Sequence, residues 1–422
     1  MARYLWLTQL YPSGLSGTSV KTKHTLEVLL QAGHSVDVVC LHHRSLLRPK
    51  LSWPGKPGQI KLWVIEKDVF SAWRLDYVLT HFGLLMSRWP FRIAKMFSNE
   101  MVKQLEILIS NHNYATIFID GYAMLQYLPF LQPTNFRSQN YQMPPLIYID
   151  DEDIAELMRQ RWSTTENWLM KIFFWWEWQK CLSYERLYLP RIQQLWAISQ
   201  QTLRRLKTLT SAKAVLMPTV VPIFPQVFKD TAQDLVFAGL LSWLENIQGL
   251  KWFLNQVWPL VRRAHPQTKL RVLGQMAQPN LVTQLQQTPG VLYRGFVPDL
   301  ATEFNQTAVA IAPILINCGI KIKVVTYLSY GLPVVTTPQS TWGLGGMGGV
   351  LTGKTPEEFA GAINQLLANR QLRLKTSRAA LKNIHQHHSA KVLIKFFQVQ
   401  KLSGFIRPTF ATQPTQRSRS WS

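Results

Sequence analysis

The chain has 422 residues, of which 47% are hydrophobic and 16% charged, and its formal net charge is +23. This length allows two domains, and the apolar content excludes a wholly disordered chain. The charge favours anionic partners such as phosphorylated ligands or lipid headgroups, whereas binding to nucleic acid is not expected because no nucleic-acid motif accompanies the charge.

Cysteines and apolar runs give an expectation for the location. Cys40, Cys181 and Cys318 are far apart, odd in number and without metal-ligand spacing, which favours a reducing compartment. The first apolar stretch is too short for a signal peptide, and no run approaches the about 18 uncharged residues of a spanning helix. We therefore expect a cytoplasmic protein.

The first half alternates predicted strands with helices, which indicates a parallel sheet. Strands are expected at 4–9, 36–41, 61–65, 115–119 and 146–149, and helices at 21–31 and 94–109. Gly14 and Gly17 lie in the loop between the first strand and its helix, although they do not form the dinucleotide fingerprint.

Two of these strands end in acidic residues. Asp120 follows one strand, and Asp150 begins an acidic run that ends at Asp153. Ligands of α/β proteins bind at the carboxyl ends of strands, so Asp120 and Asp150 are candidates for acceptor binding or for a catalytic base. Asp151 or Glu152 is expected instead to cap the helix that begins near residue 154, because acids suit that helix end.

An aromatic segment at 162–189 contains five tryptophans on a predicted helix pair. Apolar residues lie almost all around the helix from Trp168 to Trp178, which favours a core helix. The alternative is a helix in a membrane interface, since the tryptophans stand beside Lys171, Lys180 and Arg186.

A proline-rich stretch at 217–225 predicts an extended linker. After it, four strands are expected to end near Gly239, Gly274, Gly295 and Pro313, with a helix at 248–263. We therefore expect an N-terminal α/β domain at 1–215, a linker at 216–228, a second α/β domain at 229–390, a C-terminal helix at 391–408 and a disordered basic tail at 409–422. His385, His387 and His388 predict a solvated helix end rather than a metal site, because no acidic or cysteine partner accompanies them.

The segment 308–345 is predicted to form a strand, a loop, a helix from residue 321 and a further strand. Gly331 stands where a left-handed helix cap belongs. Lys321 and Lys323 occupy the first helical turn, where cations cost about 0.3–1 kcal/mol each. A bound anion would reverse the sign of this effect, and phosphate is the usual candidate. The alternative is that both lysines extend into solvent.

This segment resembles the donor-binding segment of GT-B glycosyltransferases of the glycosyltransferase-4, or group 1, type. Their pattern Gly-x-x-x-Lys-(apolar)2-Glu-Ala-(apolar)-x-x-Gly-x-Pro-Val-Val-x-Thr is matched at Gly319, Lys323, Gly331, Pro333, Val334, Val335 and Thr337. The resemblance extends to the Gly14 loop, the Gly33-His34-x-Val36 turn and the stretch 295–300, and it covers about residues 4–400.

The resemblance implies two Rossmann-like domains that face each other across a cleft. The residues that it implies for donor binding are Gly239, Asn246, Gly274, Gly319, Lys321, Lys323, Thr326, Gly343, Leu344 and Gly345. The loop of Gly14, Gly17 and Thr18 would line the acceptor side, and Lys323 would be catalytic together with Asp120 and Asp150.

Two positions depart from the family pattern. Thr326 stands where the family has a glutamate that binds the ribose hydroxyls, and Cys318 replaces the earlier glutamate of the same pair. A hydrogen bond to a charged group contributes about 1.5–3 kcal/mol, so these changes weaken the expected donor binding. Loss of activity is therefore an alternative.

The function implied is transfer of a sugar from a nucleotide-sugar donor to an acceptor hydroxyl, with retention of configuration and without a metal or other cofactor. The acceptor is expected to be an envelope or exported polysaccharide or a lipid-linked intermediate. The basic surface would hold the enzyme peripherally on the anionic inner face of the plasma membrane. An inactive GT-B scaffold, or a basic module that binds membranes or nucleic acid, are the alternatives.

Overall fold

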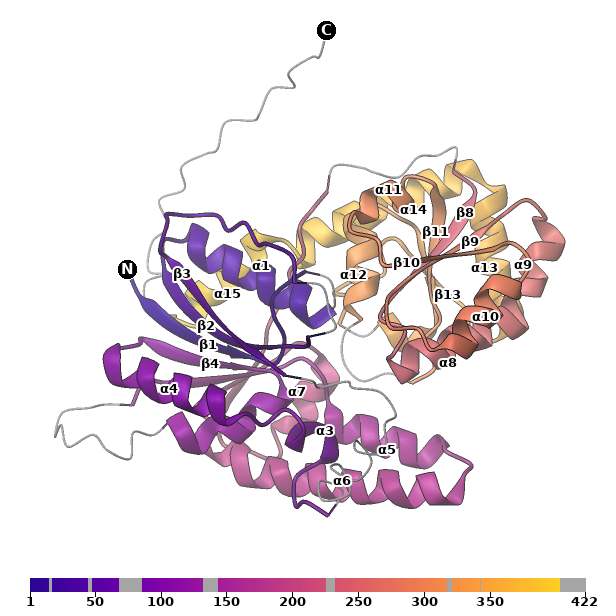
Figure 1. Cartoon of the computed structure of the whole chain (residues 1–422). Coiled ribbons are helices and arrows are strands. Elements are labelled where there is room, and N and C mark those ends of the chain that lie inside the picture. The colour runs from indigo at the N-terminus through magenta and orange to yellow at the C-terminus, as the bar shows by residue number, and fades with distance from the viewer. Residues whose placement is uncertain are drawn as a thin grey trace, which may run out of the picture.

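Two parallel β-sheets, each with helices on both faces, form the two domains of the protein (Figure 1). The computed structural model describes residues 1–14, 17–44, 48–67, 86–131, 143–224, 232–316, 321–341 and 343–402. The predicted α/β fold with two Rossmann-like domains is confirmed.

The N-terminal sheet has seven strands in the order β3-β2-β1-β4-β5-β6-β7, all parallel. Its strands are β1 (Arg3–Thr8), β2 (Ser35–His42), β3 (Ile60–Glu66), β4 (Thr116–Asp120), β5 (Leu146–Asp150), β6 (Gln194–Ala197) and β7 (Lys213–Leu216). The central strands read as continuous apolar runs because helices cover both faces. Strand order reverses between β1 and β4, where α/β proteins place ligands at the carboxyl ends of the strands.

Helices α1 (Gly17–Gln31), α3 (Phe91–Ala94), α4 (Asn99–Asn111), α5 (Ile154–Thr164), α6 (Trp168–Tyr188) and α7 (Gln200–Leu206) belong to this domain. The 3₁₀ segment η1 (Tyr122–Leu131) follows β4, and η2 (Leu189–Arg191) follows α6. Helix α1 begins directly after the Gly14 loop, so the start of α1 lies at the carboxyl edge of the sheet.

The C-terminal sheet has six parallel strands in the order β10-β9-β8-β11-β12-β13. They are β8 (Asp234–Ala238), β9 (Leu270–Leu273), β10 (Val291–Gly295), β11 (Thr307–Ala312), β12 (Val334–Thr336) and β13 (Val350–Thr352). The helical elements are α8 (Leu244–Trp252), η3 (Phe253–Val257), α9 (Trp258–Ala264), α10 (Pro279–Gln287), α11 (Leu300–Phe304), α12 (Ile322–Ser329), η4 (Pro338–Thr341), α13 (Pro356–Ala368) and α14 (Arg370–His387).

The helix predicted at 248–263 is present, but it is not a regular α-helix throughout. A π-helical turn, Phe253–Val257, separates α8 from α9, and Pro259 lies in the first turn of α9. Proline has no amide hydrogen and its ring clashes with the preceding turn, so a regular α-helix cannot pass through this position.

The chain crosses between the domains twice. It first passes from Leu216 to Asp234, and then helix α15 (Ala390–Val399) returns from α14 to the N-terminal domain. There Phe396 and Phe397 pack on Trp196 of β6. Their ring centroids lie 5.0 and 5.9 Å, respectively, from the centroid of the Trp196 ring. Helix α15 therefore fastens the C-terminal domain to the first sheet. The predicted tail at 409–422 lies outside the described residues.

Helix α6 differs from its prediction. Phe174, Cys181 and Tyr184 are buried, but the outward side of its first half, including Trp168, Trp175 and Trp176, is exposed. The expectation of a core helix is therefore wrong for that face, because only the inward face packs on the domain, against α5 and η1. Within the part of the chain that the structure describes, no helix is long and apolar enough to cross a bilayer.

Candidate active site

A cavity of about 420 Å³ lies between the two domains and is lined by residues from both. The carboxyl ends of the strands in the two sheets face it, which is the usual ligand position in open α/β sheets. Lining residues from the N-terminal domain include Gly14, Gly17, Thr18, Arg92, Asp151 and Glu152; those from the C-terminal domain include Gly239, Trp243, Asn246, Gly274, Gln275, Lys321, Lys323, Thr326, Tyr327 and Tyr330.

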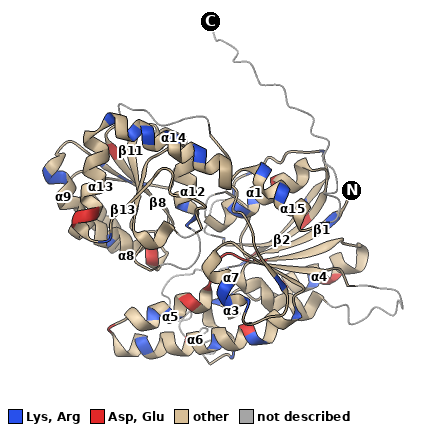
Figure 2. Ribbon diagram, turned by 180° about the vertical axis from the view of Figure 1, so that it is seen from behind, with Lys and Arg blue, Asp and Glu red and all other residues tan. Residues whose placement is uncertain are grey.

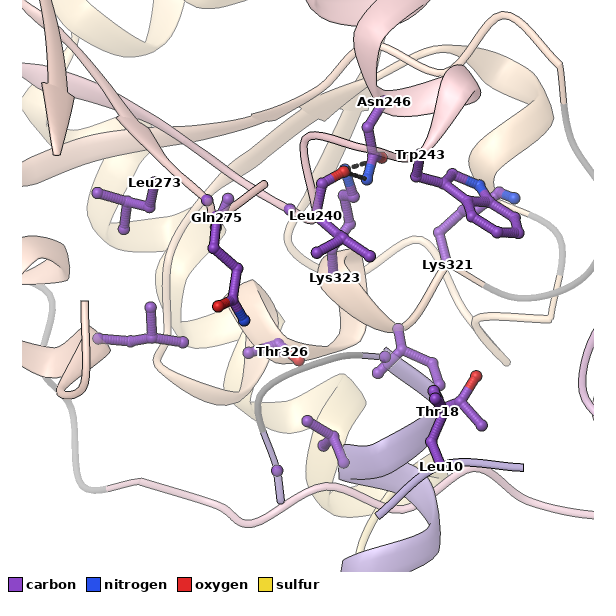
Figure 3. A pocket seen from close by; sticks show the side chains of 18 of the residues that line it. Leu10, Thr18, Leu240, Trp243, Asn246, Leu273, Gln275, Lys321, Lys323 and Thr326 are labelled. Carbon is purple, nitrogen blue, oxygen red and sulfur yellow. Dashed lines mark hydrogen bonds between the residues drawn. The ribbon is translucent and has the colours of Figure 1, made fainter. Parts of the chain in front are cut away.

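Both lysines at the start of α12 line this cavity (Figure 3). Lys321 is the N-cap residue and has no side-chain capping bond, while Lys323 lies in the first turn. The Lys323 ammonium donates to the side-chain oxygen of Asn246 at 2.6 Å and lies 4.4 Å from the centroid of the Phe237 ring. Among the described residues, Lys323 forms no ion pair with a carboxylate.

Burial, with a smaller effect from Lys321, lowers the pKa of Lys323 to about 7. A positive charge at a helix N-terminus, desolvated and beside a second lysine, is electrostatically unfavourable unless an anion balances it. A diphosphate would remove this cost because it would supply the missing negative charge. The lysines therefore line the cavity, as the anion-binding interpretation requires.

Asn246 is held in one orientation by its neighbours. Its amide nitrogen donates to the Leu240 carbonyl at 2.8 Å, which leaves the amide oxygen for Lys323. Gly239, beside both, has no room for a side chain: a Cβ there would lie 2.9 Å from the Lys323 ammonium and 2.9 Å from the Asn246 amide nitrogen. Gly274 is equally constrained, since its Cβ would lie 2.0 Å from the Gly239 carbonyl oxygen. These glycines allow the strand ends and the lysine to approach closely.

Arg92 and Glu152 form the opposite wall. The Arg92 guanidinium is 3.3 Å from the Glu152 carboxylate and 4.3 Å from the centroid of the Trp243 ring in the other domain. Burial raises the pKa of Glu152, as does the neighbouring Asp151, while Arg92 and Lys321 oppose the increase. Glu152 thus combines a raised pKa with a position on the cavity wall, which suits a group that exchanges a proton with an acceptor.

Gly14, Gly17 and Thr18 are brought to the cavity, as expected from the sequence. Gly14 has a φ of +78°, and a Cβ on Gly17 would lie 3.3 Å from the Ile322 Cβ. The start of α1 therefore lies against the start of α12. Thr326 also lines the cavity, one turn after Lys323, with Gln275 nearby (Figure 3).

The acidic residues are arranged differently from the expectation. Asp120 and Asp150 are buried and do not line the cavity, whereas Asp151 and Glu152 do. The cap of α5 is Asp153, whose side chain accepts from the Glu156 amide at 3.0 Å. The expectation that Asp151 or Glu152 caps this helix is therefore wrong, because the helix begins one residue later than a cap at Glu152 would require.

Asp120 is enclosed by donors. Its carboxylate accepts from the Lys21 ammonium, from the Thr22 hydroxyl at 2.6 Å and from the Trp6 indole at 3.0 Å. Lys21 also lies 3.4 Å from Asp151. Burial alone would lower the pKa of Lys21, but Asp120 and Asp151 raise it overall. Asp120 therefore anchors α1 to the sheet, which a strand-end position could not reveal by itself.

The glycine loop after β12 does not reach the cavity wall. Gly345 packs on His387 of α14, and the Leu344 carbonyl accepts from the ring of His388 at 3.1 Å. Gly343, Leu344 and Gly345 are therefore not among the lining residues. Cys318 and Gly319 lie outside the described residues, and their roles stay predictions.

The prediction that His385, His387 and His388 form a solvated helix end is wrong for His388. His388 is buried, and its second ring nitrogen lies 2.8 Å from the Thr219 carbonyl of the interdomain linker. Over the residues that the structure covers, no three His, Cys, Asp or Glu side chains are placed to hold a metal ion.

Two parallel-sheet domains that face each other across a ligand-sized cavity define the GT-B class. Residues 232–369, which lie in the second domain, match the family model Glycosyl transferases group 1.

Similar proteins are distant in sequence. The chain is 21% identical over 334 residues to an uncharacterized 44.6 kDa protein in the cps region of Klebsiella pneumoniae, covering 76% of this chain and 78% of that protein. The structure of HepE from Anabaena in complex with UDP and glucose aligns with a TM-score of 0.59 at 12% identity, over 95% of this chain and 99% of that one. WaaG, a glycosyltransferase involved in lipopolysaccharide biosynthesis, aligns with a TM-score of 0.58 at 14% identity, over 95% and 100%.

Sequence reasoning missed the residues of the N-terminal wall. Arg92 lies on a four-residue helix with no motif around it, and Glu152 was assigned to a cap. The ion pair between Arg161 of α5 and Glu245 of α8, at 2.6 Å, joins the two domains beside the cavity. No local sequence pattern predicts this pair either. Only the acidic run at 150–153 could have pointed to this wall.

The Lys21–Asp120 ion pair yields a stability prediction. Lys21→Met leaves Asp120 buried without its cation and should lower the free energy of unfolding by about 3–5 kcal/mol. Lys23→Met, on the same helix, removes only a 4.0 Å pair with Glu27 and should cost about 0–1 kcal/mol. Urea unfolding followed by circular dichroism measures both. Equal effects of the two substitutions would contradict the anchoring role.

Proposed function

We propose that the protein transfers a sugar from a nucleotide-sugar donor to an acceptor hydroxyl. The observation that carries this proposal is the Lys323 ammonium at the start of α12, which faces the interdomain cavity without a carboxylate partner among the described residues. The diphosphate of the donor would bind there, against Lys323, Lys321 and the free amides of the first turn of α12.

The chemistry follows from this charge distribution. When the bond between the sugar and the diphosphate breaks, negative charge develops on the departing phosphate oxygen. Asn246 already holds the Lys323 ammonium near the N-terminus of α12, so these groups would stabilise the developing charge without reorganisation. We propose that these groups replace a metal ion, and that the configuration of the sugar is retained, as the family resemblance implies.

The acceptor would approach from the N-terminal domain. We propose that the Glu152 carboxylate accepts a hydrogen bond from the reacting hydroxyl, while Arg92 holds Glu152 and spans the cavity to Trp243. This assigns to Glu152 the part that the sequence suggested for Asp120 and Asp150, which are buried away from the cavity.

The acceptor class is proposed from the relatives. One relative is encoded in a cps region, and WaaG acts in lipopolysaccharide biosynthesis. Both support an envelope or exported polysaccharide, or a lipid-linked intermediate, as the acceptor. The net charge of +23, with Lys and Arg on helices of both domains (Figure 2), supports a peripheral position on the anionic inner face of the plasma membrane.

Lys323 gives a pH-dependent prediction for donor binding. Only the protonated amine binds the diphosphate strongly, and burial beside Lys321 lowers the pKa of Lys323 to about 7. Affinity should therefore be highest below this pH and fall about tenfold per pH unit above it. Calorimetry with UDP-, GDP- and ADP-sugars selects the donor and measures the effect.

Two substitutions control that experiment. Lys323→Arg keeps a permanent charge and should flatten the pH dependence, whereas Lys323→Ala should weaken binding at every pH. If donor affinity changes neither with pH nor on Lys323→Ala substitution, the proposed diphosphate site is refuted.

Glu152 gives a prediction for the transfer step. Glu152→Gln keeps the size of the side chain but removes its basicity, so hydrolysis of the bound donor, with water as the acceptor, should slow by about 10²–10⁴-fold. Donor affinity should change less than the rate does, because the Lys323 ammonium is held by Asn246, while Glu152 acts electrostatically on Lys321. Glu156→Gln, which affects a carboxylate paired with Arg159 outside the cavity, is the matched control. Full activity of Glu152→Gln would exclude the proposed role.

An inactive GT-B scaffold is the second candidate, and Thr326 is the observation that favours it. Thr326 lines the cavity where the resembling family has a glutamate. If the site binds donors, Thr326→Glu should tighten binding by roughly the 1.5–3 kcal/mol of a charged hydrogen bond, and Thr326→Gln should gain less. A scaffold whose site no longer accepts nucleotide sugars would respond to neither substitution in the same calorimetric titration.

A further inference from the structure

The outward face of α6 carries a continuous apolar surface that the described structure leaves uncovered. Trp168, Leu169, Ile172, Trp175 and Trp176, here named the α6 stripe, are 67%, 58%, 57%, 44% and 49% exposed. Their spacing places them along one side of the helix, over about 12 Å of its length at 1.5 Å per residue. The opposite side of α6 packs on the domain, where Trp162 of α5 stacks on Trp178 at 5.5 Å.

The exposed charged residues of α6 itself are of one sign. The two acids of α6, Glu177 and Glu185, turn inward and are paired with Lys180 at 2.8 Å and Arg205 at 2.7 Å. The exposed charged residues of α6 are Lys171 and Arg186, both cations. The nearest exposed acid along the chain, Glu166, precedes the helix.

An apolar helical face with tryptophans and flanking cations matches the chemistry of an anionic bilayer surface. Tryptophan combines a large apolar ring with a polar N–H and is favoured at the boundary between headgroups and acyl chains. We propose that the α6 stripe docks on the surface of an anionic lipid bilayer, with Lys171 and Arg186 among the headgroups. The helix lies in the plane of the interface and does not span it.

The role of this docking in catalysis rests on the proposed function, because docking would bring the enzyme to a lipid-linked acceptor. Helix α5 pairs with α6 and is tied to the C-terminal domain through Arg161 and Glu245, and Glu245 lines the interdomain cavity. Docking through α6 therefore leaves α5 between the lipid surface and the cavity edge at Glu245. A lipid-linked saccharide would extend past α5 to reach the cavity while its lipid stays in the bilayer.

The test is co-sedimentation of the full chain with vesicles of phosphatidylglycerol and phosphatidylcholine, compared with phosphatidylcholine alone. Ile172→Ser should weaken binding at least about tenfold, because burial of an isoleucine contributes about 1.5–3 kcal/mol. Ile107→Ser, at a position of 53% exposure on α4, is the matched control and should bind as the unchanged protein does. Melting temperatures of both variants should stay the same, which separates docking from folding.

The charge contribution is tested with a second matched pair. Lys171→Glu should reduce binding to the anionic vesicles more than Lys103→Glu on α4, and this difference should shrink as salt is raised. Equal losses in each matched pair, or no binding to anionic vesicles, would overturn the proposal. A dimer that Ile172→Ser dissociates, without vesicle binding, would assign the α6 stripe to self-association instead. Donor affinity is measured in solution without vesicles, so failure of docking and failure of the donor site are distinguishable.

Discussion

The arrangement of the site depends on one unfavourable interaction, the placement of the Lys323 ammonium at the positive end of α12. A charged lysine that is removed from water, hydrogen-bonded to a neutral amide and next to Lys321 is unfavourable in free energy unless an anion balances it. The surroundings are built to hold it there: Gly239 and Gly274 leave space, and Asn246 is oriented by the Leu240 carbonyl. An anion that binds at this point recovers the cost, so the strain favours the bound state.

The two domains contribute opposite charges to the cavity. The C-terminal domain provides Lys321 and Lys323, whereas the N-terminal domain provides Asp151 and Glu152. The acids are balanced by cations of their own domain, Lys21 and Arg92. This separation allows one wall to hold a diphosphate and the other to interact with a hydroxyl group. Arg161–Glu245 and Arg92–Trp243 join the walls, so the distance between them depends on contacts between the domains.

Helix α15 and the interdomain linker also hold the two domains in this arrangement. Helix α15 packs its Phe396 and Phe397 on Trp196 of the first sheet, and His388 joins the linker carbonyl of Thr219 to the Leu344 carbonyl. Residues that the sequence presented as a polar histidine cluster thus serve to position the domains. The glycine loop after β12 has a related role, since it packs on α14 rather than on the cavity.

The sequence by itself determined the fold class and the donor side of the site. Alternating strand and helix patterns predicted both sheets, and the short segment from Lys321 to Thr337 carried the charges and the glycine cap of the α12 region, because these are local properties of helix ends and buried strands. The acceptor wall was decided only by the tertiary structure. Asp120, Asp150, Asp151 and Glu152 all stand at strand ends in the sequence, but packing against Lys21 buries Asp120, while the start of α5 directs Glu152 into the cavity. The sequence likewise did not determine whether the outer face of α6 is buried or exposed. An apolar helix has the same residue pattern whether that face packs in a core or contacts solvent.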